Sequence, residues 1–425
     1  SGFISGHFRM SDTSSATKVP EHAPMHQFAV VDNCLHIGGQ PLTALADRVG
    51  KTPFYAYDRT VINAQVDALR GALPPRVHLH YAMKANPMPE VVQHLAAITD
   101  GLDVASAGEL RIALETGIDP TSISFAGPGK SPEDLELAVA SGVIINMESR
   151  REMERVAVLA ERCGRRPPVA IRVNPDFELK AAGMKMGSGP KPFGVDAEQV
   201  PAMMEALSSL PLDFVGFHIF SGSQNLRPQA IIEAQTKTFE LAYHLNQAAP
   251  APIRWLNIGG GLGIPYFPGE RHLDLAAIAA NLAELVQTAA ARLPEAEIVM
   301  ELGRYLVAEA GIYVCEVVDK KESRGETFLV TNGGLHHHLA ASGNFGQVIR
   351  KNYPLCLGNR VAGDTPEEVN VVGPLCTPLD VLGHRVTLPA AVPGDLIVLF
   401  QSGAYGLSAS PVNFLSQPLP GEILV

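Results

Sequence analysis

The sequence predicts an α/β protein that consists of a (β/α)8 barrel followed by a C-terminal all-β domain. Short β-rich runs alternate with helical patterns from residue 77 to residue 304, and eight such runs can be distinguished. After Arg304 the chain changes to β-rich segments separated by turns. Strands alternating with helices form parallel βαβ units. Eight units within about 230 residues favour a closed barrel over an open doubly wound sheet.

Turn and cap residues separate the predicted barrel strands. Ser131, Pro132 and Asp134 supply an N-cap, a first-position proline and a capping-box acid. Gly117 and Gly142, like Gly164, stand where helices are expected to end. The strands predicted between these helices are 77–84, 101–106, 122–127, 143–147, 168–175, 214–222, 254–261 and 297–304.

The chain divides into four predicted segments. Residues 1–26 are interpreted as a vector remnant, SGFISGHFRM, followed by a polar, disordered terminus. Residues 27–50 contain the strand-like FAVVDNCLHIGG, which we expect to pack with the β domain. The barrel is predicted over 51–304 and the β domain over 305–425.

Composition restricts the class of ligand. The formal net charge is −11, and no block of clustered lysine and arginine occurs, so we expect neither a nucleic-acid partner nor a membrane surface. Five cysteines without a CxxC pair indicate neither a disulfide framework nor a zinc site, which fits a cytoplasmic protein. The consecutive residues His336, His337 and His338 cannot all face one ion, so we expect no metal. A small-molecule substrate is therefore predicted.

Lys84 is the first candidate for chemistry. It ends the run VHLHYAMK and shares strand parity with His80 and Ala82, so its amine is expected at the mouth of the barrel. A lysine at that place can form a Schiff base with a carbonyl compound. The alternative is an ordinary solvated lysine at a strand end.

The last two barrel strands end in a potential phosphate site. Asn257–Tyr266 reads NIGGGLGIPY, and its glycines would let backbone N–H groups approach an anion, although a tight turn is equally compatible. The eighth strand ends in ELGR, where Arg304 can pair with a phosphate and Glu301, deeper in the barrel, with a cationic ring nitrogen. A lysine, a phosphate cradle and a buried carboxylate together predict pyridoxal 5′-phosphate (PLP).

The chain resembles a known family over nearly all of residues 27–425. The motifs that carry the resemblance are YAMKANP, GLDVASAGEL, RVNPD, GSQN, GGGLGIPY, ELGRYLVAEAG, GPLCTPLD, SGAYG and the terminal EILV. They are similar to those of the fold-type III (alanine-racemase-fold) PLP-dependent decarboxylases, the group of diaminopimelate and ornithine decarboxylases. Within this group the chain most resembles the decarboxylases associated with exosortase gene clusters.

The resemblance implies roles for the matching residues. Lys84 would hold PLP as an aldimine, Glu301 would pair with the pyridine nitrogen, and decarboxylation of an amino acid would pass through a quinonoid. Cys376 would come from the neighbouring subunit of a homodimer and protonate the substrate carbon; without the resemblance, a small buried hydrophobic side chain is the simpler interpretation. The remaining implied cofactor contacts are Gly260, Gly261, Ser223, Arg304 and Tyr405 at the phosphate and Asp103 and Arg172 near the ring, and Arg304 and Tyr405 are also implied to contact the substrate.

Two departures from the family pattern bear on specificity. Diaminopimelate and ornithine decarboxylases have an acidic residue after the cysteine, where this chain has Thr377. Threonine cannot pair with a distal ammonium, so we expect a substrate with an amide, a conjugated group or a carrier-protein tether, although the nearby Asp380 offers another acid. In GFHIFSGSQ, the position of the ring-stacking histidine is Phe220, while His218 lies on the same strand face; either ring can cover the cofactor, and His218 can also be a core residue.

Two other functions are alternatives to decarboxylation for a chain of this kind. An amino-acid racemase of the same fold pairs the ring nitrogen with arginine, whereas the carboxylate of Glu301 keeps the ring cationic and favours decarboxylation. A catalytically silent PLP-binding relative that binds a partner protein is disfavoured, because Lys84, Glu301 and Cys376 are all present.

Overall fold

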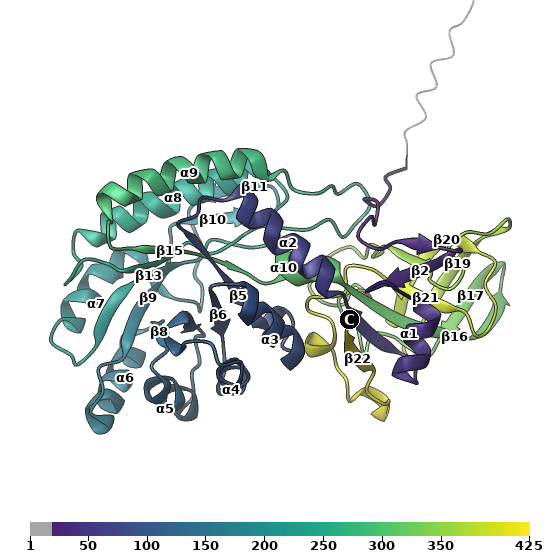
Figure 1. Cartoon of the computed structure of the whole chain (residues 1–425), viewed down its shortest axis with the longest axis horizontal. Helices are drawn as coiled ribbons and strands as arrows, with labels where there is room; N and C mark the ends of the chain where they lie inside the picture. Colours follow the sequence, from purple (N-terminus) through teal and green to yellow (C-terminus); the bar gives the residue numbers. More distant parts are fainter. Residues whose placement is uncertain (1–18) are drawn as a thin grey trace, which may run out of the picture.

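The computed structural model describes residues 19–425 (Figure 1). The predicted vector remnant (1–10) and residues 11–18 of the predicted disordered terminus lie outside this range. Residues 21 and 22 already contact the folded protein: the Glu21 carbonyl accepts a hydrogen bond from Gly269 N at 2.8 Å, and His22 Nε2 lies 2.7 Å from the Asn352 carbonyl oxygen. Residues 21 and 22, which the prediction assigned to a disordered terminus, therefore belong to the folded protein.

Eight parallel strands form the closed barrel that the sequence predicts. In order around the barrel, β9 is followed by β13, β14, β15, β5, β6, β7 and β8, and β8 pairs with β9 to close it. Each run begins and ends within a few residues of its predicted range. The strands are β5 (Val77–Ala82), β6 (Gly101–Val104), β7 (Ile123–Phe125), β8 (Ile144–Met147), β9 (Pro168–Asn174), β13 (Asp213–Ile219), β14 (Trp255–Asn257) and β15 (Glu297–Leu302).

The helices cover the outside of the barrel and begin and end where the sequence indicates. In α5, Ser131 accepts a hydrogen bond from Asp134 N, the Asp134 carboxylate accepts one from Ser131 N, and Gly142 ends the helix with φ 81°. Only glycine adopts such a φ without strain. The helices are α2 (Arg59–Ala72), α3 (Pro89–Ile98), α4 (Ala107–Glu115), α5 (Pro132–Ser141), α6 (Arg150–Cys163), α7 (Val200–Leu207), α8 (Pro228–Asn246) and α9 (Leu275–Arg292), with the short α10 (Arg304–Val307) after β15.

Beside the barrel lies the predicted β domain, on the right in Figure 1. Its long central strand β16 (Gly311–Ser323) pairs with β17 (Glu326–Thr331) and β21 (Leu396–Leu399). The sheet also contains β18 (Leu355–Leu357), β19 (Pro366–Val372), β20 (Val381–Pro389) and β22 (Gly421–Leu424). Within the described range, no helix is long and apolar enough to span a bilayer.

One boundary of the prediction is wrong. Strand β4 (Phe54–Tyr57) pairs with β16 and β22, so these residues belong to the sheet of the β domain rather than to the barrel predicted over 51–304. The sequence of a short apolar strand such as β4 does not indicate which sheet the strand joins. A strand that is buried on both faces has the same apolar pattern in the barrel and in the β domain.

The segment before β4 packs against the β domain. Strands β1 (Val30–Val31), β2 (Cys34–Ile37) and β3 (Gln40–Pro41) form a small sheet of their own, and α1 (Leu42–Val49) follows. Leu35 N donates a hydrogen bond to the Gly358 carbonyl oxygen at 2.8 Å. Ile37 shares a buried apolar cluster with Val314 and Val398, which joins this segment to the β domain.

The three consecutive histidines have separate surroundings in the β domain. His337 Nδ1 lies 2.8 Å from the Tyr313 hydroxyl, and His338 Nε2 lies 2.9 Å from Ser402 Oγ. Both ring nitrogens of the buried His336 are without a hydrogen-bond partner in the described chain. Within residues 19–425, no group of three or more His, Cys, Asp or Glu side chains is arranged to hold a metal ion.

Burial of His336 makes stability dependent on pH. Burial lowers the pKa of His336 to about 4, whereas an unfolded histidine has a pKa of about 6.5. The unfolded state therefore binds the proton more tightly, so stability is lost as the pH falls from about 6.5 towards 4. His336→Phe is expected to reduce this loss by about 1–2 kcal/mol between pH 7 and pH 5, as measured by urea denaturation. Equal losses of stability in the wild type and in His336→Phe would show that His336 does not cause this pH dependence.

Candidate active site

Lys84 lies at the C-terminal end of β5, in a single helical turn over Met83–Ala85. Its neighbours Met83 and Ala85 are buried, whereas its own side chain lines a cavity at the mouth of the barrel. The cavity has two halves, and both are lined by Lys84, Phe220 and Glu301. The structure therefore places the amine of Lys84 between two compartments of one site.

The first half of the cavity has the character of an anion cradle, and we call it the phosphate half. It is lined by Ser223, Gly261 and Arg304 together with Gln224, Gly303 and Tyr405. Gly261 has φ 86°, and a Cβ there would lie 2.9 Å from Leu179 Cδ2, so the loop requires glycine. Gly260, also predicted at the phosphate, does not itself line either half of the cavity. Glycine is required there because a Cβ would overlap the Glu301 carbonyl oxygen on β15.

Arg304 supplies the positive charge of the phosphate half. Its guanidinium donates a hydrogen bond to the Tyr266 hydroxyl at 2.7 Å and stacks on Tyr405 with 4.6 Å between Cζ and the ring centroid. Burial opposes the charge, but the interaction with Tyr266 outweighs it and raises the pKa of Arg304. Tyr405 has φ 52° and donates its N–H to the Ala85 carbonyl oxygen at 2.8 Å. The aromatic ring is thereby tied to the loop that carries Lys84.

The second half, which we call the ring half, contains the carboxylate of Glu301. Asn257 Nδ2 donates a hydrogen bond to Glu301 Oε2 at 3.0 Å, and His218 Nε2 lies 2.9 Å from the same oxygen without the alignment of a hydrogen bond. Burial alone would raise the pKa of Glu301, but the interaction with His218 and then the charge of Lys84 lower it. Glu301 is therefore an anion at neutral pH.

Asp103 lies on the neighbouring strand β6 and also lines the ring half. Its Oδ1 lies 2.8 Å from His80 Nδ1 and accepts a hydrogen bond from Ser124 Oγ at 2.7 Å. Its Oδ2 is buried and has no partner in the described chain. Burial raises the pKa of Asp103 despite the opposing effect of His80. An oxygen without a partner at the wall of a cavity is a natural acceptor for a ligand.

Arg172, at the end of β9, closes the ring half from the side. Its guanidinium lies over Phe193 and Phe220, with 5.3 Å and 5.8 Å from Cζ to the ring centroids. Glu148 holds it at 3.2 Å from Nη1 and also accepts a hydrogen bond from Gly194 N at 3.0 Å. Phe220 borders both halves of the cavity, whereas His218 lines only the ring half and lies against Glu301.

Three predicted residues of the β domain are not brought to this cavity within one chain. Cys376 and Thr377 lie in the loop between β19 and β20; Cys376 is exposed, which excludes a purely apolar buried role, and neither residue lines the two halves. Asp380 is only 3% exposed, and its carboxylate accepts hydrogen bonds from Leu335 N at 2.7 Å and Leu375 N at 3.0 Å. This geometry contradicts the predicted substrate contact of Asp380, whose oxygens instead fix the loop.

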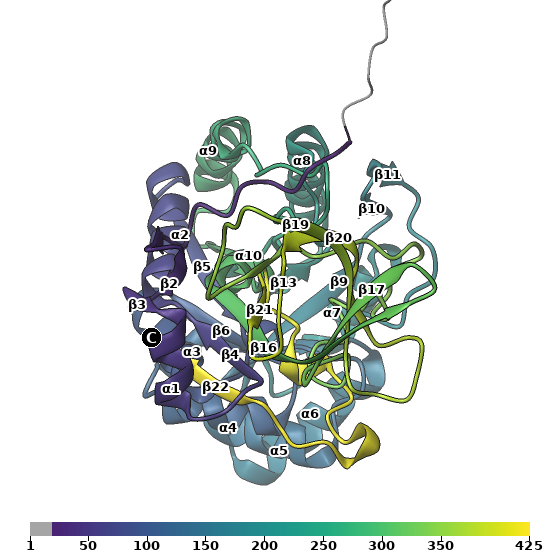
Figure 2. The same cartoon turned by 90° about the vertical axis from the view of Figure 1, so that its right-hand side faces the viewer.

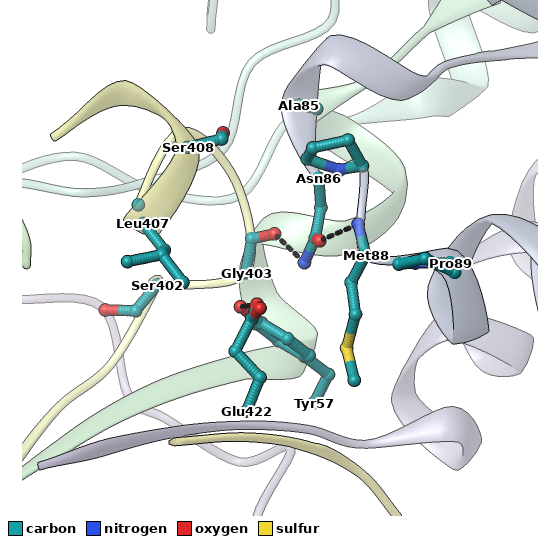
Figure 3. A pocket seen from close by; sticks show the side chains of 12 residues that line it. Tyr57, Ala85, Asn86, Met88, Pro89, Ser402, Gly403, Leu407, Ser408 and Glu422 are labelled. Atoms are coloured by element: carbon teal, nitrogen blue, oxygen red, sulfur yellow. Dashed lines mark hydrogen bonds between the residues drawn. The ribbon is translucent and has the colours of Figure 1, made fainter. Parts of the chain in front are cut away.

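A separate cavity lies on the far side of the Lys84 loop (Figure 3). Asn86 Nδ2 donates a hydrogen bond to the Gly403 carbonyl oxygen at 3.0 Å, and Asn86 Oδ1 accepts one from Met88 N at 3.1 Å. Tyr57 donates a hydrogen bond to Glu422 Oε2 at 2.7 Å along the same cavity wall. The hydrogen bond from Asn86 to Gly403 fixes the Lys84 loop to the β domain, which gives Asn86 a structural reason two residues after the lysine.

Comparison with known proteins identifies the family. Residues 59–308 match the family model described as the pyridoxal-binding domain of pyridoxal-dependent decarboxylases. The chain belongs to this family. This decarboxylase is 41% identical over 393 residues to the L-glutamyl-[BtrI acyl-carrier protein] decarboxylase of Niallia circulans, covering 90% of each chain.

One further relative supports membership of the family, and one solved structure shows the fold. The diaminopimelate decarboxylase of Aquifex aeolicus is 32% identical over 408 residues, covering 93% of this chain and 91% of the relative. The fold is shared with the crystal structure of diaminopimelate decarboxylase from M. jannaschii in complex with L-lysine. The two structures superpose with a TM-score of 0.85 at 24% sequence identity, and the match covers 94% of this chain and 92% of the M. jannaschii chain. The chain is thus a PLP-dependent carboxy-lyase that acts on an amino acid or an amino-acid conjugate.

The residues at the cavity fit PLP. The phosphate half offers Arg304, small residues and backbone N–H groups to a phosphate, and the ring half offers the ionised Glu301 to a protonated ring nitrogen. The unpartnered oxygen of Asp103 leaves one acceptor for a ligand donor. Sequence reasoning missed three residues that support this arrangement, Tyr266, Asn257 and His80, although the parity that His80 shares with Lys84 already placed it inside the barrel.

Proposed function

We propose that this decarboxylase removes the α-carboxylate of an amino acid that is held in a conjugate, with a carrier-protein thioester as the favoured form. The observation that carries the proposal is the absence of an acidic partner for a distal ammonium in the loop after Cys376. Thr377 has no charge, and both oxygens of Asp380 are occupied by backbone N–H groups. The 41% identity to an enzyme named for a glutamyl carrier protein supports the same choice.

The chemistry divides between the cofactor and the side chains. When bound, PLP supplies an electron sink for the carbanion left by the departing carboxylate. The Lys84 amine is the group that would hold the cofactor through its aldehyde. Glu301 holds a proton on the ring nitrogen by remaining ionised, while Arg304 retains the phosphate. The Cys376 thiol delivers the proton to the substrate carbon.

We further propose that the active site is shared across a homodimer. In one chain Cys376 lies on an exposed loop away from the Lys84 cavity, so a second copy is needed to bring the two together. The adjoining surface is apolar: Phe345, Val348, Ile349 and Leu379 are between 49% and 101% exposed. Asn344 Nδ2 donates a hydrogen bond to the Leu379 carbonyl oxygen at 3.1 Å, which joins the two loops of this surface. Such a patch is typical of an interface.

A cytoplasmic location completes the proposal. All five cysteines, which include Cys315 in the core and Cys163 at the surface, are unpaired. Free thiols on the surface and in the interior fit a reducing compartment.

Cys376→Ala is expected to lower the turnover rate about 10²-fold, the usual contribution of a general acid, while PLP remains bound. Mixing this variant with Lys84→Ala tests the shared site. If the chains exchange, half of the dimers are hybrids and each hybrid has one intact site, so about a quarter of wild-type activity should return. Recovery of no activity from demonstrated hybrids would place both residues in one chain, and an unchanged rate in Cys376→Ala would assign the proton to another residue.

Steady-state kinetics test the proposed substrate class. The values of kcat/KM for free meso-diaminopimelate and L-ornithine are expected to lie far below the value for an L-glutamyl thioester that is joined through the side-chain carboxyl and keeps its α-carboxylate free. Turnover of either free diamino acid at rates as high as that of the thioester would show that another group recognises the distal ammonium, and the inference from Thr377 would fail.

A further inference from the structure

A cationic hairpin borders the mouth of the Lys84 cavity. Strands β10 (Phe177–Lys180) and β11 (Gly183–Met186) follow β9, and Figure 2 shows this hairpin beside α8. Leu179 N donates a hydrogen bond to the Ser221 carbonyl oxygen at 2.6 Å, and the Leu179 side chain lies against Gly261 of the phosphate half. The hairpin therefore rests directly on the glycine loops of the site.

The outer side of the hairpin carries an unusual charge for this protein. Residues 177–193 contain Lys180, Lys185 and Lys191 but only one acid, in a chain whose net charge is −11. That acid, Glu178, is partly buried and lies 3.1 Å from Lys180 Nζ and 2.9 Å from Lys191 Nζ, so its charge is already paired. Arg227, at the start of α8, adds a further cation and donates a hydrogen bond to the Ala182 carbonyl oxygen at 2.8 Å.

Exposed apolar side chains accompany these cations. Met186 is 56% exposed and Phe193 is 45% exposed. Phe193 also lines the ring half of the cavity, where it lies under the Arg172 guanidinium. One continuous segment thus presents lysines and a methionine to solvent and ends at the entrance to the site, whereas the three lysines themselves do not line the cavity.

We propose that residues 177–193, together with Arg227, form the docking surface for an acidic carrier protein that delivers the substrate. This inference rests on the proposed function, because it requires a substrate attached to a carrier. Complementary charge would attract and orient the carrier, and the exposed Met186 would add apolar contact at short range. An arm that passes Phe193 enters the ring half beside Lys84, so docking on this surface directs the tethered amino acid towards the reactive amine.

The test compares one amino acid in two forms. The substrates are two L-glutamyl thioesters joined through the side-chain carboxyl, so that the α-carboxylate stays free to leave. One is the thioester of the BtrI carrier protein of Niallia circulans, and the other is the thioester of pantetheine, which lacks a protein. For the triple variant Lys180→Glu, Lys185→Glu, Lys191→Glu, kcat/KM with the carrier-bound form is expected to fall on the order of 10-fold or more, mainly through KM. Turnover of the pantetheine form should not change. Added salt should weaken the wild-type preference for the carrier-bound form.

The matched control is a triple reversal at the other end of the barrel. Arg162, Arg165 and Arg166 are exposed where α6 ends, just before β9 begins, so Arg162→Glu, Arg165→Glu, Arg166→Glu changes the total charge equally, far from the cavity mouth. This control should keep wild-type kinetics with both substrates.

Each result bears on a different claim. Equal turnover of carrier-bound glutamate by the wild type and the lysine variant would overturn the docking surface and leave the proposed function standing. Equal loss on both thioesters would assign the lysines to the site itself and would also overturn docking. If the wild type decarboxylated neither thioester, the proposed function and the docking surface would both fail.

Discussion

Lys84→Ala is expected to abolish decarboxylation and the visible absorption band of the lysine-bound cofactor. The amine of Lys84 is the nucleophile at the centre of the cavity, between the phosphate half and the ring half. Without it, PLP can still be retained by Arg304 but cannot be linked to the chain. Absorption spectra of the variant loaded with PLP, recorded before and after borohydride, provide the measurement.

An exposed lysine away from the cavity serves as the control. Lys237 lies on α8 with its side chain 42% exposed, beside Glu240, so Lys237→Ala should keep both the band and the activity. A wild-type spectrum in Lys84→Ala would remove the basis for assigning the cofactor to this cavity.

Glu301→Gln is expected to lower the turnover rate about 10²–10³-fold, as is typical for the loss of a preorganised charge in an active site. Neighbouring positive charge keeps Glu301 ionised despite its burial. A neutral amide cannot hold a proton on the ring nitrogen, and the cofactor then becomes a poorer electron sink. Single-turnover kinetics with the preferred substrate separate this loss from any change in substrate binding.

The same strand provides a matched control. Glu297 begins β15, at the opposite end from Glu301, and pairs with His78 outside the cavity. Glu297→Gln should therefore leave the turnover rate close to that of the wild type. Equal rates for Glu301→Gln and Glu297→Gln would show that the ring nitrogen does not depend on Glu301.

The part of the site that the barrel contributes is predictable from the sequence because the barrel is symmetric. Consecutive parallel strands bring their C-terminal ends to one face, so recognition of the eight runs already predicts that Lys84, Glu301 and Arg304 lie close together. Asp103 and Arg172 were implied only by the resemblance to the family. The predicted helix ends are also confirmed. Gly142 and Gly164, which end α5 and α6, both adopt the left-handed backbone conformation that favours glycine.

No comparable rule predicts from the sequence which residues of the β domain lie at the site. Asp380 stands four residues after Cys376 and has the right charge for a substrate contact, yet it is used by the backbone of its own loop. Strand β4 joins the second sheet through pairings with β16 and β22 that are remote in sequence. Contacts of this kind depend on how the two domains pack, which the periodicity of the sequence does not report.

The supporting residues around the site were missed for a related reason. Tyr266 and Glu148 contact the predicted residues Arg304 and Arg172 across loops that carry no chemical motif of their own. The β10–β11 hairpin lies between the fifth and sixth predicted strands and is not among the predicted elements. Its lysines gain significance only from their position at the cavity mouth.

The most direct test of the central claim is a competition in one vessel. L-glutamate, meso-diaminopimelate and the side-chain-linked L-glutamyl thioester of pantetheine, which keeps its α-carboxylate free, are supplied at equal concentration to the PLP-loaded protein. Loss of carbon dioxide from each is followed by mass spectrometry. Loss from the thioester first, with the free acids almost unchanged, is the result expected for a decarboxylase of conjugated amino acids. Preferential loss from meso-diaminopimelate would contradict this account and would show that the site recognises a free distal ammonium without an acid at position 377.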